Sequence, residues 1–225
     1  MEHDQRFKTL LRTFFADFLR LFFARWAARF DLSHIEWLDK ELMSGSPESP
    51  VHVVDLLASV HALEPLDGML AGQAWLILVH IEIDSSESAS RLRAKMPQYY
   101  WQLRATYDVP VLPIGLFLRM NLDGVGEEVV VEKFWEMEVD IFRFLRVGLL
   151  GLDAIEYLQG DNWLGVALSA LMKIPPEKVV WLGAEALRRI SQASLEYGER
   201  VLLAECFQAY LPLQAAQQAE FDRLL

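Results

Sequence analysis

Apolar side chains in the first thirty residues follow the period of an α-helix. Between about Asp4 and Arg29 they recur at three- and four-residue steps. The stripe comprises Phe7, Leu10, Leu11, Phe14, Phe18, Leu21, Phe22 and Trp26. Such a wide stripe predicts a helix that packs on a large apolar surface. Flanking arginines would also suit a helix lying in a membrane interface, but Asp17 and the lack of a lipidation motif favour the first interpretation.

Three strand-like segments follow this helix. They begin near Ile35, Val51 and Ala74, and the turn-rich stretches MSGSPESP and EPLDGMLAGQ separate them. We expect consecutive antiparallel strands. The third, AWLILVHIEID, is almost continuously apolar, which is typical of a central strand covered on both faces.

A second helix and a fourth strand complete the pattern. The helix is predicted from about Ser86 to Thr106, bent or restarted at Pro97, and the strand VLPIGLFLRM begins at Val111. A strand, helix, strand crossover predicts a mixed sheet. The fold class is therefore α/β, with the order α-β-β-β-α-β and helices flanking the central sheet.

Beyond Asn121 the segment VVVEKFWEMEVDIFRF predicts one or two further strands, and the chain from about Asp153 is helical. Pro175 and Pro176 separate two of these helices and suit the start of the second. We expect a sheet-containing domain at residues 1–150 and a helical extension at residues 151–225 that packs on it.

Composition restricts the setting. The 225 residues are 53% hydrophobic, enough for one substantial core, and the single Cys206 cannot form an intramolecular disulfide. No signal-peptide pattern is present, and the longest apolar run is about half of the roughly 20 residues that a membrane-spanning helix needs. These features predict a cytoplasmic protein without a membrane partner.

The formal net charge of -11 argues against a protein that coats nucleic acid over its whole surface. Any such contact must be local. Between Ser88 and Tyr107 the chain carries four basic residues and no acid, whereas the stretch from Glu127 to Asp140 is strongly acidic. The basic stretch suits phosphate binding, and a solvated helix face is the alternative.

Carboxylates gather at the ends of two predicted strands. Asp55 lies in the second strand, and Glu82 and Asp84 point to one face of the third because alternate side chains share a face. If Asp55 lies across from Glu82, three acidic groups converge, and a divalent cation relieves their repulsion. Mg²⁺ held this way would orient water for attack on a phosphodiester. The alternative is the exposed end of an ordinary strand.

Several segments in order resemble the Rpn family of recombination-promoting nucleases, also described as transposases. They are HDQRFK, LLRTFFADFLRLFF, IEWLDKEL, VDLL, LVHIEID, VPVLPIGLF, LDAIEYL and ALSALMKI. The resemblance covers most of the chain. It implies a PD-(D/E)XK nuclease-like core, metal-dependent DNA endonuclease activity (a hydrolase) and a link to DNA recombination or mobile elements.

The resemblance also implies roles for individual residues. Asp55 matches the first metal-binding Asp of the family and Glu82 its second acidic ligand, while Ile83 can lend a backbone carbonyl. Asp84 departs from the pattern, since the superfamily usually has Lys there and related chains commonly have Gln; it could serve as a third ligand or a general base. Asp4 matches a further carboxylate of the family, and a helix cap is the alternative.

The helix after Glu82 supplies second-line candidates. Lys95 could take the place of the missing motif Lys, and Tyr99 matches a family aromatic. We expect phosphate contacts from Arg91, Lys95 and Arg104, the alternative being solvent-facing side chains. His80 could be a ligand, but a lone His in a strand is more often structural.

These features predict a Mg²⁺-dependent DNA endonuclease. Two alternatives stay open. One is a catalytically degraded nuclease fold that binds DNA or protein, and the other is an acidic oligomerisation or adaptor module whose last third is its interface. Whether the protein forms a homodimer is also open.

Overall fold

The computed structural model describes residues 2–38, 41–42, 52–66, 76–85 and 90–224, with the backbone alone described at 2–4, 41–42 and 52–53. The chain divides into two compact units. Arg25–Gly148 form a sheet unit, and Met1–Ala24 join Leu149–Leu225 in a helical unit. The division near residue 150 falls beside the expected domain boundary, and residues 1–24 group with the C-terminal helices.

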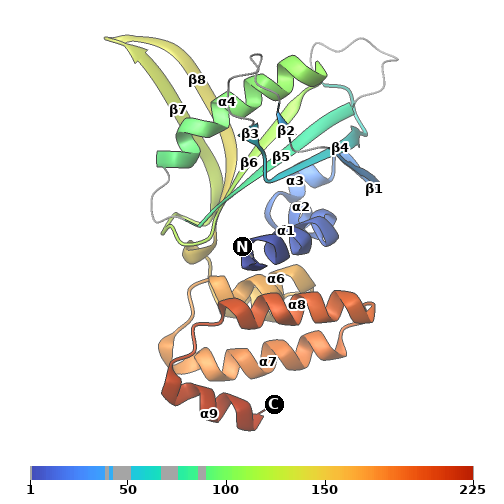
Figure 1. The fold of residues 1–225 in the computed structure, drawn as a ribbon, viewed down its shortest axis with the longest axis vertical. Helices are drawn as coiled ribbons and strands as arrows, with labels where there is room; N and C mark the ends of the chain where they lie inside the picture. Colours follow the sequence, from blue (N-terminus) through green and yellow to red (C-terminus); the bar gives the residue numbers. More distant parts are fainter. Residues whose placement is uncertain (1, 39–40, 43–51, 67–75, 86–89, 225) are drawn as a thin grey trace. The chain divides into compact units, whose positions relative to one another are not determined.

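The sheet unit contains a six-stranded mixed sheet (Figure 1) in the order β1-β4-β5-β6-β8-β7. β5 runs parallel to β6 and β6 parallel to β8, and the other neighbours are antiparallel. The elements are β1 (Phe30–Trp37), β2 (Glu41–Leu42), β3 (His52–Val53), β4 (Leu56–Ala62), β5 (Leu76–Asp84), α4 (Ser90–Tyr107), β6 (Val111–Phe117), β7 (Val125–Phe134) and β8 (Met137–Gly148), preceded by the short α3 (Ala24–Ala27).

The predicted α/β class, with a mixed sheet, flanking helices and a helical C-terminal region, is confirmed. Two details differ. The strand expected from Val51 divides into β3 and β4, and α4 continues through Pro97 without restarting. A buried side of α4 explains this continuity, because Met96 and Tyr99 on either side of Pro97 are both packed against the sheet.

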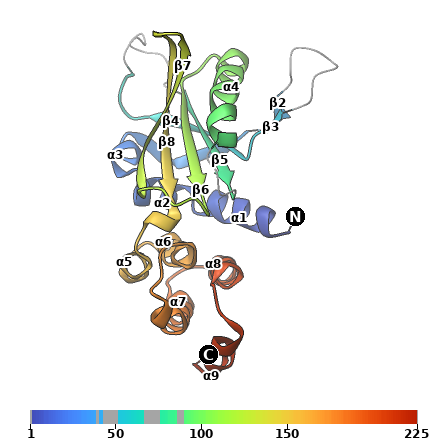
Figure 2. The ribbon, with the colours of Figure 1, turned by 90° about the vertical axis from the view of Figure 1, so that its left-hand side faces the viewer.

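α4 lies along one face of the sheet (Figures 1 and 2) and packs on it through two clusters. One comprises Val54, Leu57, Leu78, Tyr99 and Leu103, and the other Leu92, Met96, Phe117, Phe142 and Phe144. Burying each large apolar side chain contributes about 1.5–3 kcal/mol. This packing fixes the basic side chains of α4 relative to the end of β5.

The helical unit starts with α1 (Glu2–Thr13) and α2 (Phe15–Phe22) and continues with α5 (Ala154–Gln159), α6 (Trp163–Leu168), α7 (Val179–Gln192), α8 (Tyr197–Tyr210) and α9 (Ala215–Leu224), plus the 3₁₀ turns η1 (Leu149–Gly151), η2 (Ser169–Leu171) and η3 (Pro176–Lys178). Asp153 caps α5 by accepting from Ile155 N at 2.8 Å. Pro176 opens the turn before α7, as expected from the Pro pair.

The single helix expected from Asp4 to Arg29 is wrong. The backbone leaves the helical region at Phe14 (φ -107°, ψ 33°) and Phe23 (φ -137°, ψ 45°). The breaks let aromatic side chains that would spread around one helix all become buried: Phe14, Phe15, Phe18, Phe22 and Phe23. Phe14 N still donates to the Leu10 carbonyl at 3.0 Å and Phe23 N to the Leu19 carbonyl at 2.8 Å, so the chain changes direction without losing these hydrogen bonds.

α1 packs on α8 within the helical unit. The rings of Phe7 and Tyr210 meet edge to face with centroids 5.7 Å apart, and the buried Cys206 lies beside the Arg6 carbonyl. Burial, and secondarily Glu205, raises the pKa of the Cys206 thiol to about 11. Among the described residues, no helix is both long and apolar enough to cross a membrane.

Candidate functional site

The main candidate site lies where β4 begins and β5 ends. The ladder between these strands pairs Leu56 with Ile81, so Asp55 stands one step further on, opposite Glu82. The two acids are interlocked through the backbone. Asp55 N donates to Glu82 Oε1 at 2.9 Å, and Ile83 N donates to Asp55 Oδ2 at 2.8 Å. The predicted pairing of Asp55 with Glu82 therefore occurs in the fold.

His80 contacts the same oxygen of Glu82 that accepts from Asp55 N. It is fully buried two residues earlier on the same face of β5, and its Nε2 lies 2.9 Å from Glu82 Oε1. A neutral imidazole that carries its proton on Nε2 donates this bond. Nδ1 is then a buried acceptor without a partner among the described residues. The side chain is structural in the sense that it orients Glu82.

All hydrogen bonds of Glu82 within the described residues use Oε1. Oε2 is thus the oxygen left for another ligand. Ile83 points its N–H toward Asp55, and in an extended strand the carbonyl of the same residue points to the same side. The Asp55 carboxylate, Glu82 Oε2 and the Ile83 carbonyl are oxygen donors of the kind that a hard cation such as Mg²⁺ prefers.

Asp84 is buried two residues beyond Glu82 on the same face of β5. Across the parallel ladder it pairs with Phe117 of β6, and the carbonyl of Asp84 accepts from Leu118 N at 2.9 Å. Within the described residues, no three His, Cys, Asp or Glu side chains are grouped closely enough to hold a metal ion. Asp55, Glu82 and Asp84 therefore do not form a ready-made cluster of three carboxylates.

α4 brings part of its basic side to the acidic pair. The ring of Tyr99 packs edge to face on His80 with centroids 5.8 Å apart, and Lys95 Nζ lies 5.9 Å from the Tyr99 centroid. Burial raises the pKa of Tyr99, and the charges of Glu82 and Asp55 raise it further, whereas Arg91 lowers it. The pKa of Tyr99 therefore depends on the charges of Glu82, Asp55 and Arg91.

Arg104 is placed elsewhere. It lies thirteen residues after Arg91, about 20 Å along the helix. With Tyr100 it lines a separate cavity of about 740 Å³, which Trp26 and Arg29 also line. The expected contact surface of Arg91, Lys95 and Arg104 is consequently divided between two places on the sheet unit.

The remaining predicted ligand, Asp4, and the fourth basic residue of α4, Arg93, are placed differently. Asp4 lies in α1, but its side chain is outside the described residues, so its predicted role as a ligand stays a prediction. Arg93 is engaged by the acidic strand: its Nε donates to Glu128 Oε1 at 2.7 Å, and Arg146 lies against the other oxygen of Glu128. This ion pair ties α4 to β7.

The sequence predicts a structural role for His80, but it does not identify Glu82 as the partner of His80. The signal that could have identified this partner is the period-two spacing of polar residues in an otherwise apolar strand, which puts His80 and Glu82 on one face. Comparisons with models of protein families, with characterised proteins and with solved structures found no match. The resemblance to the Rpn nucleases stays a prediction.

Proposed function

We propose that the protein is a Mg²⁺-dependent nuclease that hydrolyses phosphodiester bonds of DNA. The observation that carries the proposal is the interlocked pair of Asp55 and Glu82, directly opposed at the end of the central strand. Two opposed carboxylates repel each other unless a cation lies between them or one of them holds a proton, and a divalent cation is the solution we propose here. Bound there, a divalent ion would stabilise charge on the phosphate and orient a water molecule.

The residues of the chain have separate parts in this proposal. Asp55, the free oxygen of Glu82 and the Ile83 carbonyl would hold the ion, and His80 orients Glu82 from behind. Arg91 and Lys95, on the α4 side of the site, would attract the phosphate backbone. Asp84 would act as a general base from the end of β5, or as a third ligand only if its carboxyl moves toward the ion, because it is not grouped with Asp55 and Glu82 in the described structure.

The arrangement of β1, β4, β5, α4 and β6 supports a PD-(D/E)XK-like core as the finer description of the fold. Three antiparallel strands are followed by a helical crossover to a parallel strand. The acidic pair lies on the middle two of these four strands. A reducing cytoplasm, with DNA as the partner, is the setting that this proposal requires. The link to recombination rests on the sequence resemblance alone.

A second candidate is a catalytically degraded member of the same fold that binds DNA or a protein. The observation that favours it is the acid at position 84, where the resemblance calls for Lys or Gln. The two candidates differ in one measurable property, since only the enzyme needs a divalent ion at Asp55 and Glu82.

The test combines plasmid nicking with a direct metal titration. Asp55→Asn and Glu82→Gln keep shape and hydrogen-bonding capacity but remove charge, and Glu127→Gln changes an exposed acid of β7 as a matched control. We expect wild type and Glu127→Gln to nick DNA with Mg²⁺ and not with EDTA, and each site variant to lose about 100-fold or more. Calorimetry with Mg²⁺ should lose its binding heat in the same two variants.

Asp84→Ala should weaken Mg²⁺ binding if Asp84 is a ligand, and should leave binding intact but lower the nicking rate if it is a general base. Wild-type protein that neither binds Mg²⁺ nor nicks DNA, yet binds DNA, would replace the enzyme with the degraded nuclease fold. Nicking that survives both Asp55→Asn and Glu82→Gln would remove the site from the mechanism.

A further inference from the structure

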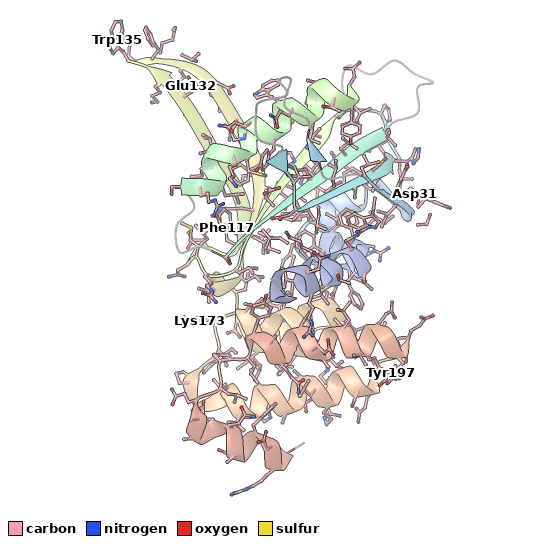
Figure 3. All side chains as sticks on the ribbon, in the orientation of Figure 1. Asp31, Phe117, Glu132, Trp135, Lys173 and Tyr197 are labelled. Carbon is pink, nitrogen blue, oxygen red and sulfur yellow. The ribbon has the colours of Figure 1, made fainter. Side chains whose placement is uncertain are left out.

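The hairpin of β7 and β8 extends away from the rest of the sheet as a two-stranded ribbon (Figures 1 and 2). β8 pairs with β6 only from Leu145 to Gly148, whereas its pairing with β7 continues to the last pair, Phe134 with Met137. Figure 3 shows Trp135 at the end of this ribbon. Its outer half therefore has no neighbouring strand within the described residues.

Exposed apolar side chains are concentrated on this hairpin. Of the thirteen large apolar side chains that are exposed among the described residues, eight lie here: Val125, Val129, Val131, Phe134, Trp135, Met137, Val139 and Ile141. Scattered exposed apolar side chains need no explanation, but their concentration on one hairpin indicates an interaction surface.

The two faces of the hairpin have different chemistry. Val131 pairs with Ile141, and both lie on the face that carries Val129. The other face turns toward α4, where Val130 packs on the cluster that contains Phe142. Further out, that second face is acidic, since Glu132 pairs with Asp140. The first face thus exposes Val125, Val129, Val131 and Ile141 around the ion pair of Glu127 with Arg143, and the second face bears carboxylates further out.

The turn at the tip of the hairpin holds Trp135 in a backbone conformation that aromatic residues rarely adopt. Trp135 has φ 55°, a conformation that Gly, Asn or Asp adopt most easily in a two-residue hairpin turn. Its side chain is 83% exposed, so packing within the described part of the fold does not account for it. A bulky residue held at positive φ and left in solvent points to a contact outside the chain.

β7 is also the last strand in the order of the sheet. Alternate residues of this ten-residue strand present outward-facing N–H and C=O groups over roughly 33 Å, and an edge of this kind can accept an added strand. Between Val125 and Ile141 the chain carries six acids against Lys133. Glu127, Glu128 and Glu138 form ion pairs with basic side chains, so the acidic character is carried by the remaining three: Glu132, Glu136 and Asp140. This charge disfavours nucleic acid and anionic membranes and favours a basic partner.

We propose that the β7–β8 hairpin is a docking arm for a partner protein, which contributes an extended segment of alternating apolar and basic side chains that pairs with the edge of β7. Side chains of an added strand alternate between faces. The apolar ones would extend the surface of Val129 and Val131, and the basic ones would lie beside Glu132 on the other face. This role does not depend on the proposed nuclease activity.

The test uses labelled ten-residue peptides of defined chemistry and the full chain. A peptide of alternating Lys and Val should bind at least about tenfold more tightly than matched Glu-Val and Lys-Ser peptides, and added salt should weaken its binding. The double variant Val131→Thr with Ile141→Thr and the single variant Trp135→Asn should each lose about tenfold or more. Asn suits the positive φ, so the turn is preserved. Tyr197→Ser, at an exposed aromatic of α8, is the matched control.

Each alternative has its own readout. Equal binding of the Lys-Val and Glu-Val peptides, or unchanged binding by both hairpin variants, overturns the proposal. Sedimentation velocity that detects a dimer in wild type and a monomer in the hairpin variants would assign the surface to a second copy of the chain. Co-sedimentation with anionic phospholipid vesicles, lost in Trp135→Asn, would assign it to a membrane surface.

Discussion

Gly115 of β6 faces the buried side chain of Leu92 on α4, and replacing Gly115 with Ala tests how tightly the helix packs on the sheet here. Gly115 pairs with Glu82 across the parallel ladder of β5 and β6. A Cβ atom at this position would stand 2.9 Å from Leu92 Cδ2, 2.9 Å from Phe144 Cε2 and 3.2 Å from Phe117 Cε2. All three neighbours belong to one buried cluster and cannot turn into solvent.

Overpacking a core by one methyl group costs about 1–3 kcal/mol, and two contacts this short place Gly115→Ala in the upper part of that range. Removing a glycine from a strand returns about 0.5–1 kcal/mol by restricting the unfolded chain. The net loss in free energy of unfolding is therefore about 1–2 kcal/mol. For a chain of this size, that loss lowers the melting temperature of the sheet unit by roughly 2–8 °C.

Thermal unfolding followed by circular dichroism measures this effect, with Gly126→Ala as the matched control in the same sheet. A Cβ at Gly126 meets only the flexible Arg146 side chain, at 3.4 Å. The control should keep or slightly raise the melting temperature. An unchanged or higher melting temperature in Gly115→Ala would refute the close packing of α4 on β6 beside Glu82.

Two further predictions concern the electrostatics of α4. The variant Glu82→Gln should lower the pKa of Tyr99, because the raised value depends in part on the Glu82 carboxylate. Ultraviolet absorbance during an alkaline titration measures this pKa. Mg²⁺ bound at the site should also lower the pKa of Tyr99. Because the pKa of Tyr99 is raised in the folded state, its contribution to stability is present below about pH 10 and declines as the pH rises above that value. Replacing Arg91 and Lys95 with Gln should lower the slope of log affinity for DNA against log salt by the equivalent of up to about two phosphate contacts, whereas Arg104→Gln should leave this slope unchanged. An equal decrease of the slope in both proteins would contradict the division of α4 into two surfaces.

The elements that local pattern determines could be predicted from the sequence. An uninterrupted apolar run identified β5 as a central strand, and the helical crossover between β5 and β6 gave the mixed sheet. The first helix could not be predicted as it is. Its division at Phe14 and Phe23 depends on which aromatic side chains find a buried position, and that is decided by distant parts of the chain.

In the candidate site, the placement of the acidic residues was predictable from local pattern, and the placement of Arg104 was not. Period two placed Glu82 and Asp84 on one face, and the strand order made Asp55 a neighbour of Glu82. The position of Arg104 was not predictable from helical charge alone, because a helix of 18 residues is long enough to reach two separate surfaces.

The hydrogen bonds of His80 limit which of its ring nitrogens can carry a proton beside Glu82. A protonated His80 would neutralise Glu82, but it would bury an Nδ1–H group that has no acceptor among the described residues. Leaving a buried donor unsatisfied costs about 1–3 kcal/mol, and more for a charged group. A neutral His80 that donates from Nε2 to Glu82 Oε1 avoids this cost. Arg91 is exposed and Lys95 is partly so, and solvent screens their charges. The proposed divalent cation would lie between the carboxylates of Glu82 and Asp55, and the Mg²⁺ titration of wild type against Asp55→Asn and Glu82→Gln tests whether it binds there.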